Sequence, residues 1–66
     1  MASTVKMARI GAELNQQEVA DLMGIHVQTY AKMEKHPDEM SIAEAKRFAK
    51  IVNLKVSDIF FEPDSN

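Results

Sequence analysis

Apolar side chains recur every three or four residues along most of the 66-residue chain, and strict alternation is rare. This period is typical of amphipathic helices that bury one face, so the sequence predicts an all-α domain. The clearest stripe lies in the second half of the chain and consists of Ile42, Ala45, Phe48, Ala49 and Val52. We expect this stripe to face the core of the domain.

Five helices follow from this pattern and from the residues that start and stop helices. Their predicted ranges are 4–13, 16–23, 27–35, 41–52 and 55–61, and the tail 62–66 is expected to be flexible. Two of the starts carry a capping box, formed by Asn15 with Glu18 and by Ser41 with Glu44. Gly11 lies inside the first predicted helix and is expected to loosen its last turn.

A single glycine separates the second and third predicted helices. Gly24 can turn the chain sharply without a Cβ clash, and Ala20 offers a small side chain where two helices would cross. Two short helices joined in this way have the spacing of a helix-turn-helix, in which the second helix projects the residues at its start away from the core. We therefore expect a sharp bend at Gly24. Asn53 can end the fourth helix in the same left-handed conformation.

The balance of charges narrows the possible functions. Eight basic and ten acidic side chains give a net charge of −2, whereas a basic footprint is usual in proteins that bind nucleic acids. The distribution matters more than the sum, because residues 26–36 carry two lysines against one glutamate, while acidic residues gather at 38–39 and 58–64. The balance disfavours tight non-specific binding to DNA and leaves specific binding open.

Other function classes find no support in the composition. The chain has no cysteine, and its two histidines lie ten residues apart on different predicted elements, so we expect no disulfide, no metal site and no cofactor. It has no glycine-rich phosphate loop and no nucleophile–base–acid set, so we expect no enzyme. No apolar run reaches membrane-spanning length and no secretory signal is visible, so a cytoplasmic protein without membrane contact is the expectation.

Several residues stand at a joint spacing that is typical of one family. They are Arg9, Leu14-Asn15-Gln16, Ala20, Met23-Gly24-Ile25 and Glu34, followed by Ser41 and the segment NLKVSDIF. In this pattern residues 5–60 resemble the Cro/cI-type (Xre-like) helix-turn-helix family of phage repressors and bacterial regulators. The resemblance implies a compact five-helix, lambda-repressor-like DNA-binding domain. The sequence departs from the family at His26, where Ser or Thr is usual, and at Asp38-Glu39, where related proteins often carry basic or polar residues near the DNA backbone.

The resemblance implies that the start of the third helix enters the major groove of DNA. Gln28 would bond bidentately to adenine, Val27 would pack on a thymine methyl group, and Lys32 would reach guanine. Thr29 would donate to a base or a phosphate. The alternative for each of these residues is an ordinary solvated or packed helix face.

A second set of residues is expected to hold the DNA backbone. The free amides and the dipole at the start of a helix favour an anion, and the resemblance implies that Gln16 clamps a phosphate there with Asn15 as a helper. Lys35, His26 and His36 would add phosphate contacts, which position the protein without reading sequence. Capping for the first two and solvation for the other three are the alternatives.

Arg9 is expected to point inward rather than toward DNA. The resemblance pairs it with Glu34 across the first and third helices, and such a buried pair would fix the placement of the third helix. Near the C-terminus, consecutive helical residues face about 100° apart, so Phe60 and Phe61 cannot both be buried easily in one small core. An exposed phenylalanine suggests an interface, and a dimer interface is therefore expected at Ile59, Phe60 and Phe61.

Together these features predict a sequence-specific DNA-binding transcriptional regulator, most like a phage Cro-type repressor. A homodimer would match a pseudo-palindromic operator in double-stranded DNA. The alternative is a protein-binding helix-turn-helix module that acts as an antirepressor or antitoxin on a DNA-binding partner. The acidic net charge and the pair Phe60-Phe61 both fit this alternative, in which the partner is a second regulatory protein. A purely structural helical bundle is a third possibility.

Overall fold

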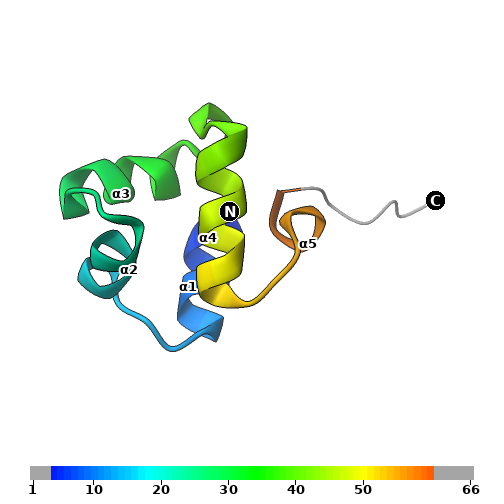
Figure 1. Cartoon of the computed structure of the whole chain (residues 1–66), viewed down its shortest axis with the longest axis horizontal. Coiled ribbons are helices and arrows are strands. Elements are labelled where there is room, and N and C mark those ends of the chain that lie inside the picture. Colours follow the sequence, from blue (N-terminus) through cyan, green and yellow to red (C-terminus); the bar gives the residue numbers. More distant parts are fainter. Residues whose placement is uncertain (1–3, 61–66) are drawn as a thin grey trace.

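The computed structural model describes residues 4–60 as helices joined by short turns (Figure 1). In chain order the elements are α1 (Thr4–Gly11), α2 (Gln16–Met23), α3 (Val27–Lys35), a 3₁₀ turn (Pro37–Glu39), α4 (Ile42–Val52) and α5 (Val56–Phe60). Within these residues no strand occurs. The predicted fold class, a compact all-α domain with five helices, is therefore confirmed. Phe61 and the tail 62–66, which were expected to extend α5 and then to be flexible, lie outside the described residues.

Capping side chains explain why α2 and α4 begin where they do. The Asn15 side chain accepts from the backbone amide of Glu18, and the Glu18 carboxylate accepts from the backbone amide of Asn15. Ser41 and Glu44 form the same reciprocal pair at the start of α4. Both predicted capping boxes are confirmed, and each satisfies amides that a helix start leaves without intrahelical partners.

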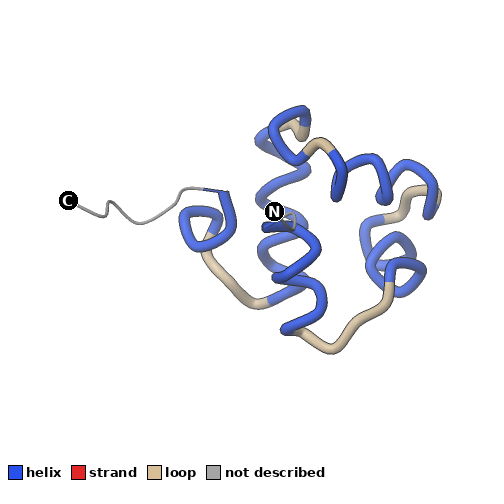
Figure 2. Tube along the Cα trace, turned by 180° about the vertical axis from the view of Figure 1, so that it is seen from behind, coloured by secondary structure: helices blue, strands red, loops and turns tan. Residues whose placement is uncertain are grey.

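Gly24 closes α2 in the left-handed conformation, with φ 71° and ψ 33°, and its backbone amide donates to the carbonyls of Ala20 and Asp21. The helix therefore cannot continue into α3, and the predicted bend at Gly24 is confirmed. Asn53 ends α4 in the same way at φ 59° and ψ 45°. In Figure 2 the turn between α2 and α3 is one of the short loops that separate two clearly distinct helices.

The first helix ends earlier than we expected. The range 4–13 is wrong at its C-terminal end, because α1 stops at Gly11 and the left-handed residue is Glu13, at φ 61°. The amide of Leu14 donates to the Arg9 carbonyl and that of Glu13 to the Ile10 carbonyl, which is the hydrogen-bond pattern of a Schellman C-cap. A glutamate thus occupies a position that usually takes glycine, and Gly11 lies two residues before it.

Figures 1 and 2 show α2 and α3 on one side of α1 and α4, with α5 on the other side. α2 packs against both α3 and α4, while α5 packs against α1 and α4. The Tyr30 and Phe48 rings lie with their centroids 6.1 Å apart at the centre of the domain. The buried core consists of Val5, Val19, Ala20, Met23, Tyr30, Met33, Phe48, Ala49, Val52 and Ile59.

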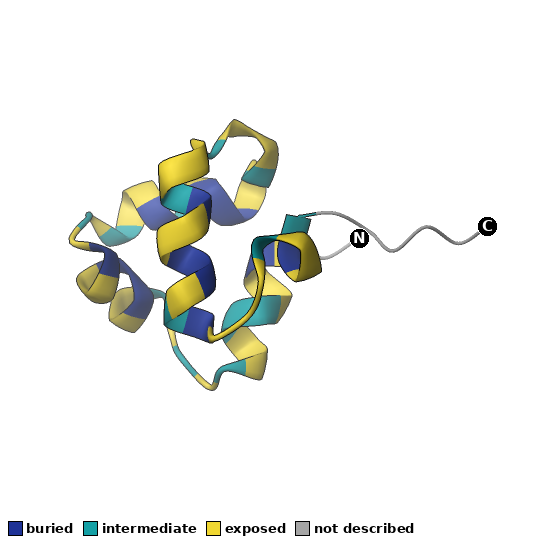
Figure 3. Ribbon diagram, turned by 45° about the vertical axis from the view of Figure 1, so that its right-hand side comes forward, coloured by how far each residue is buried: buried dark blue, intermediate teal, exposed yellow. Residues whose placement is uncertain are grey.

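The buried stripe of α4 includes four of its five predicted members, Ala45, Phe48, Ala49 and Val52. In Figure 3, buried bands alternate with exposed ones along this helix. The expectation for Ile42 is wrong, since its side chain is 76% exposed. Ile42 is the first residue of α4, preceded by the cap Ser41 and the 3₁₀ turn at 37–39. This turn was not predicted as a helical element.

Two further observations apply to the part of the chain that the structure describes. None of its helices has the length and apolar character that crossing a membrane requires. Among the same residues, histidine and carboxylate side chains form no group of three or more that could hold a metal ion.

Candidate nucleic-acid interface

The third helix has two unlike faces. Tyr30, Met33 and Glu34 are buried, whereas Gln28 and Lys32 are exposed to solvent. The buried face packs against α1 and α2, and the exposed face begins directly after the bend at Gly24. The bend therefore presents an uncovered polar helix face on the surface of the domain.

Two other residues at the start of α3 were expected to contact DNA. Thr29 is exposed beside Gln28, while Val27 is half-buried and packs against the core. The methyl groups of Val27 are thus shared between the core and the surface. His26 precedes the helix with an extended backbone, is exposed, and makes no side-chain hydrogen bond as a cap. The first amides of α3 therefore receive no cap from His26, in contrast to the starts of α2 and α4.

At the start of α2 the structure gives Asn15 and Gln16 different tasks. Asn15 is exposed, and its side-chain oxygen is taken up by the capping box. Gln16, the first residue of α2, is half-buried, and its Nε2 donates to Glu34 Oε1 at 2.9 Å. This hydrogen bond was not foreseen. It ties the residue that was expected to clamp a phosphate to the buried face of α3.

The Glu34 carboxylate lies at the centre of a polar cluster that joins three helices. Arg9 Nε donates to Glu34 Oε2 at 2.5 Å, and the side chains of this ion pair are only 12% and 6% exposed. The Tyr30 hydroxyl donates to the same oxygen at 2.7 Å. Arg9 also reaches the Leu14 carbonyl through a second nitrogen at 2.9 Å. We call Arg9, Gln16, Tyr30 and Glu34 the Glu34 cluster.

The sequence analysis did not identify Tyr30 as a member of this cluster. A signal existed, because Tyr30 precedes Glu34 by four residues and such residues are neighbours on one helix face. The bond from Gln16 spans 18 positions of the sequence, and no local pattern announces it. The Gln16 bond supplies the partner of Oε1, while Arg9 and Tyr30 share Oε2, so both oxygens of the buried carboxylate are satisfied.

The cluster shifts the pKa values of its ionisable members. Burial alone would raise the pKa of Glu34, but hydrogen bonds from Arg9, Tyr30 and Gln16 outweigh it and lower that pKa below the ordinary glutamate value. The hydrogen bond to Glu34 raises the pKa of Arg9. Burial, followed by the bond to Glu34, raises the pKa of the Tyr30 hydroxyl. At neutral pH the cluster is therefore a carboxylate that accepts from a guanidinium, a phenol and an amide.

Beyond the cluster, α3 ends among charged side chains. Lys35 and His36 are exposed, and the backbone amide of His36 donates to the Lys32 carbonyl at 2.8 Å. A small hollow of about 170 Å³ lies between this end of α3 and the start of α4. It is lined by Thr29, Lys32, Met33, His36, Glu39, Met40 and Glu44. Acidic groups thus stand next to the side of α3 that was expected to approach DNA.

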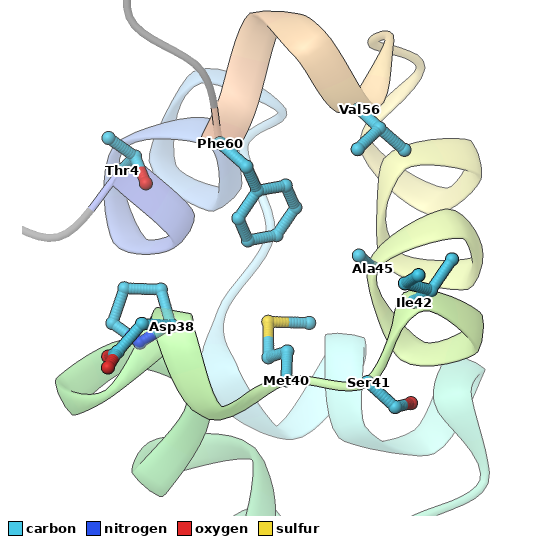
Figure 4. Close-up of a pocket in the computed structure, with 9 residues that line it drawn as sticks. Thr4, Asp38, Met40, Ser41, Ile42, Ala45, Val56 and Phe60 are labelled. Carbon is cyan, nitrogen blue, oxygen red and sulfur yellow. The ribbon is translucent and has the colours of Figure 1, made fainter.

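The expected dimer interface is only partly available. Ile59 is 3% exposed and belongs to the core, so assigning it to an interface was wrong. Phe60 is half-buried and points into an apolar hollow of about 390 Å³ between α4, α5 and the 3₁₀ turn (Figure 4). Met40, Ile42 and Val56 line the same hollow. Phe61, the third residue of the expected interface, lies outside the described residues.

The sequence was compared with family models, with curated proteins and with solved structures. One family model, described as Helix-turn-helix, matches residues 5–59. No curated protein and no solved structure gave a significant match. The matched range runs from the first core residue of α1 to the last core residue of α5, so it contains α2, α3 and α4 entirely and all but one residue each of α1 and α5.

Proposed function

We propose that this chain, which belongs to the Cro/cI-type helix-turn-helix family, is a transcriptional repressor. In this proposal α3 reads the operator. Membership of the family makes the chain a DNA-binding helix-turn-helix domain with a lambda-repressor-like fold. The proposal adds the residues, the groove, the symmetry and the direction of regulation. Repression would follow from occupancy of an operator that overlaps a promoter.

The observation that carries the proposal is the division of α3 into a locked face and a presented face. Its buried side is held by core packing and by the Glu34 cluster. Its exposed side carries polar groups whose shapes match the donors and acceptors of base edges. A helix that is fixed on one side and uncovered on the other can enter a groove without rearrangement.

Each exposed residue of α3 has a proposed part in reading DNA. Gln28 offers an amide that can bond bidentately to adenine, and Lys32 offers a cation that can reach guanine. Thr29 donates to a base or a phosphate. Val27 contributes the part of its side chain that the core leaves uncovered to a thymine methyl group.

The backbone contacts are proposed to flank these bases on both sides. Gln16 and Asn15 lie at the start of α2, where the helix dipole and unpaired amides favour a phosphate. His26, Lys35 and His36 are exposed at the two ends of α3. These contacts hold the register of the domain on the duplex and carry no sequence information themselves.

A homodimer on a pseudo-palindromic operator completes the proposal. The two-fold axis of such a site requires the same surface from both copies. With Ile59 in the core, the apolar surface available to a second copy includes Phe60 and the hollow beside it, where Ile42 is 76% exposed.

Selection of bound sequences from random double-stranded DNA tests this proposal directly. We expect enrichment of a pseudo-palindrome, and binding to that duplex should weaken with salt by roughly 0.9 log units per log unit of salt for each phosphate that is neutralised. If no sequence is enriched, even at low salt, sequence-specific binding is refuted. A reporter gene downstream of the recovered site, expressed with and without the protein, tests repression.

The same apolar hollow favours a second candidate function, in which the domain binds another regulatory protein as an antirepressor or antitoxin. Exposed apolar surface beside acidic groups suits a protein partner as well as a second copy. The variant Ile42→Glu distinguishes the two candidate functions, because it removes a different interaction in each. Under the proposed function this variant weakens dimerisation and leaves contact with a single half-site intact. Under the second candidate, wild type binds no DNA by itself and the variant loses a co-purifying partner chain.

A further inference from the structure

Gln16 has a place in both the interior and the proposed DNA surface. Its side chain is half-buried, and Nε2 donates to Glu34 Oε1. An amide has two N–H groups on its nitrogen, so one remains after this bond is made. The direction of the second N–H depends on how firmly Glu34 holds the first.

An ionised carboxylate dictates the orientation of an amide beside it. Because it can only accept hydrogen bonds, the amide must present its nitrogen and not its oxygen. A phosphate is likewise only an acceptor at its oxygens. An amide that is tied by one N–H to Glu34 therefore keeps its other N–H for a phosphate, whereas a freely rotating amide presents its oxygen part of the time.

The Glu34 carboxylate is itself held by two donors on its other oxygen. Arg9 Nε and the Tyr30 hydroxyl both donate to Oε2, which leaves Oε1 for Gln16. The Tyr30 side chain is fully buried and its ring packs near Phe48. Its hydroxyl is thus a rigid donor. Without it, Oε2 would keep Arg9 alone and the carboxylate would be free to rotate away from Gln16.

We propose that Tyr30 and Glu34 are positioning residues for the phosphate contact of Gln16, acting by fixing its side-chain amide with one N–H toward DNA. The inference rests on the proposed DNA contact of Gln16 and extends it into the interior. Tyr30 lies beneath the DNA surface and touches no DNA. It acts on binding through two hydrogen bonds in series, from Tyr30 to Glu34 and from Gln16 to Glu34.

A double-mutant cycle tests this connection. The variants Tyr30→Phe, Gln16→Ala and their combination are titrated with the duplex recovered from random-sequence selection, at a temperature where circular dichroism shows all of them folded. Each single change is expected to weaken binding by about twofold to tenfold, the value of one hydrogen bond. The double variant is expected to bind no more weakly than Gln16→Ala, because Tyr30 acts only through Gln16.

Gln28→Ala provides the matched control. It also removes an amide from the proposed DNA surface, but the Gln28 side chain is exposed on α3 and is not part of the Glu34 cluster. Its effect should therefore add to that of Tyr30→Phe. If Tyr30→Phe leaves affinity unchanged, or if its effect adds equally to those of Gln16→Ala and Gln28→Ala, Tyr30 does not position Gln16.

A second readout needs no DNA. In ¹⁵N-resolved NMR spectra of the free protein, the two side-chain amide protons of Gln16 should differ in shift and in exchange rate, since one is bonded to Glu34. In Tyr30→Phe they should move toward the pair from Gln28. Unchanged Gln16 signals in that variant would overturn the inference while leaving the proposed function in place. Failure of wild type to select any DNA would overturn both.

Discussion

The two faces of α3 differ in what holds them and in what a substitution would remove. On the inward face, Glu34 accepts hydrogen bonds from three side chains of the described fold. On the outward face, Gln28 and Lys32 are exposed, and the hydrogen bonds that they can make remain for another molecule. Residues two to six positions apart on one helix thus serve the fold and the proposed function separately.

This difference teaches that affinity and stability should be separable in this domain. A change on the inward face alters how much protein is folded, whereas a change on the outward face alters how well the folded protein binds. Gln16, which lies on α2 and reaches Glu34, and Val27, which packs partly against the core, belong to both. Through Gln16, a change at Tyr30 or Glu34 is also expected to reach binding. Four predictions test the separation, beginning with the largest expected effect.

Arg9→Met should lower the free energy of unfolding by about 3–5 kcal/mol, because it leaves Glu34 buried without its cationic partner. Affinity per folded molecule should fall by much less. Urea denaturation and DNA titration of the same preparation measure the two quantities. Lys6→Met is the control, since it removes a positive charge from an exposed position of α1. Equal stability of Arg9→Met with loss of binding would show that Arg9 serves DNA and not the fold.

Gln28→Ala should have the opposite signature. Its effect on the free energy of unfolding should stay within about 0.5 kcal/mol, as for other exposed positions. Binding to the selected operator should lose about 1–3 kcal/mol, the value of one bidentate contact with a base. Discrimination should be relaxed at one base pair of each half-site, which a panel of single-base operator variants would reveal. Uniform weakening across that panel would place Gln28 on the backbone instead.

Acid should weaken the inward face through Glu34. The pKa of Glu34 is lowered in the folded protein, chiefly by its hydrogen bond from Arg9 against the effect of burial. A lowered pKa stabilises the fold above the unfolded value, near 4.5, and this contribution is lost as the pH falls through the folded pKa. Wild type should therefore lose stability below pH 4.5, more steeply than Glu34→Gln. Glu13→Gln, an exposed control, should keep the wild-type slope.

Lys35→Ala should give the smallest effect, visible mainly in the dependence of binding on salt. If Lys35 neutralises one phosphate, its removal reduces the slope of log affinity against log salt by about 0.9. Lys46→Ala changes the net charge equally but lies on α4, outside the proposed surface, and should leave the slope unchanged. Identical slopes for both variants and for wild type would remove Lys35 from the interface.

The sequence was most informative where structure depends on neighbours along the chain. Both capping boxes need only a side chain and an amide three residues apart, and both are present. Gly24 and Asn53 take the left-handed conformation at the helix ends where it was expected. Such features depend on local backbone geometry, which a short pattern of residue types can specify.

The features that were missed depend on distant parts of the chain or on local conformations of similar energy. The bond from Gln16 to Glu34 requires α2 and α3 to be packed first. Ile42 has the right spacing for the buried stripe, but it is the first residue of α4 and lines an open hollow that leaves it 76% exposed. The end of α1 was placed at residue 13 instead of Gly11, because a glutamate does not signal the left-handed conformation that Glu13 adopts.

The Glu34 cluster also bears on whether the helix-turn-helix can be excised from this protein. A peptide of residues 15–36 would contain all of α2, the bend and α3, but it would lack Arg9. In this peptide Glu34 would lose the Arg9 guanidinium and become exposed to solvent. Tyr30 would lose its packing partner Phe48. The segment from α2 to α3 therefore does not keep its structure by itself, and any transfer of it to another protein must include α1 and α4 as well.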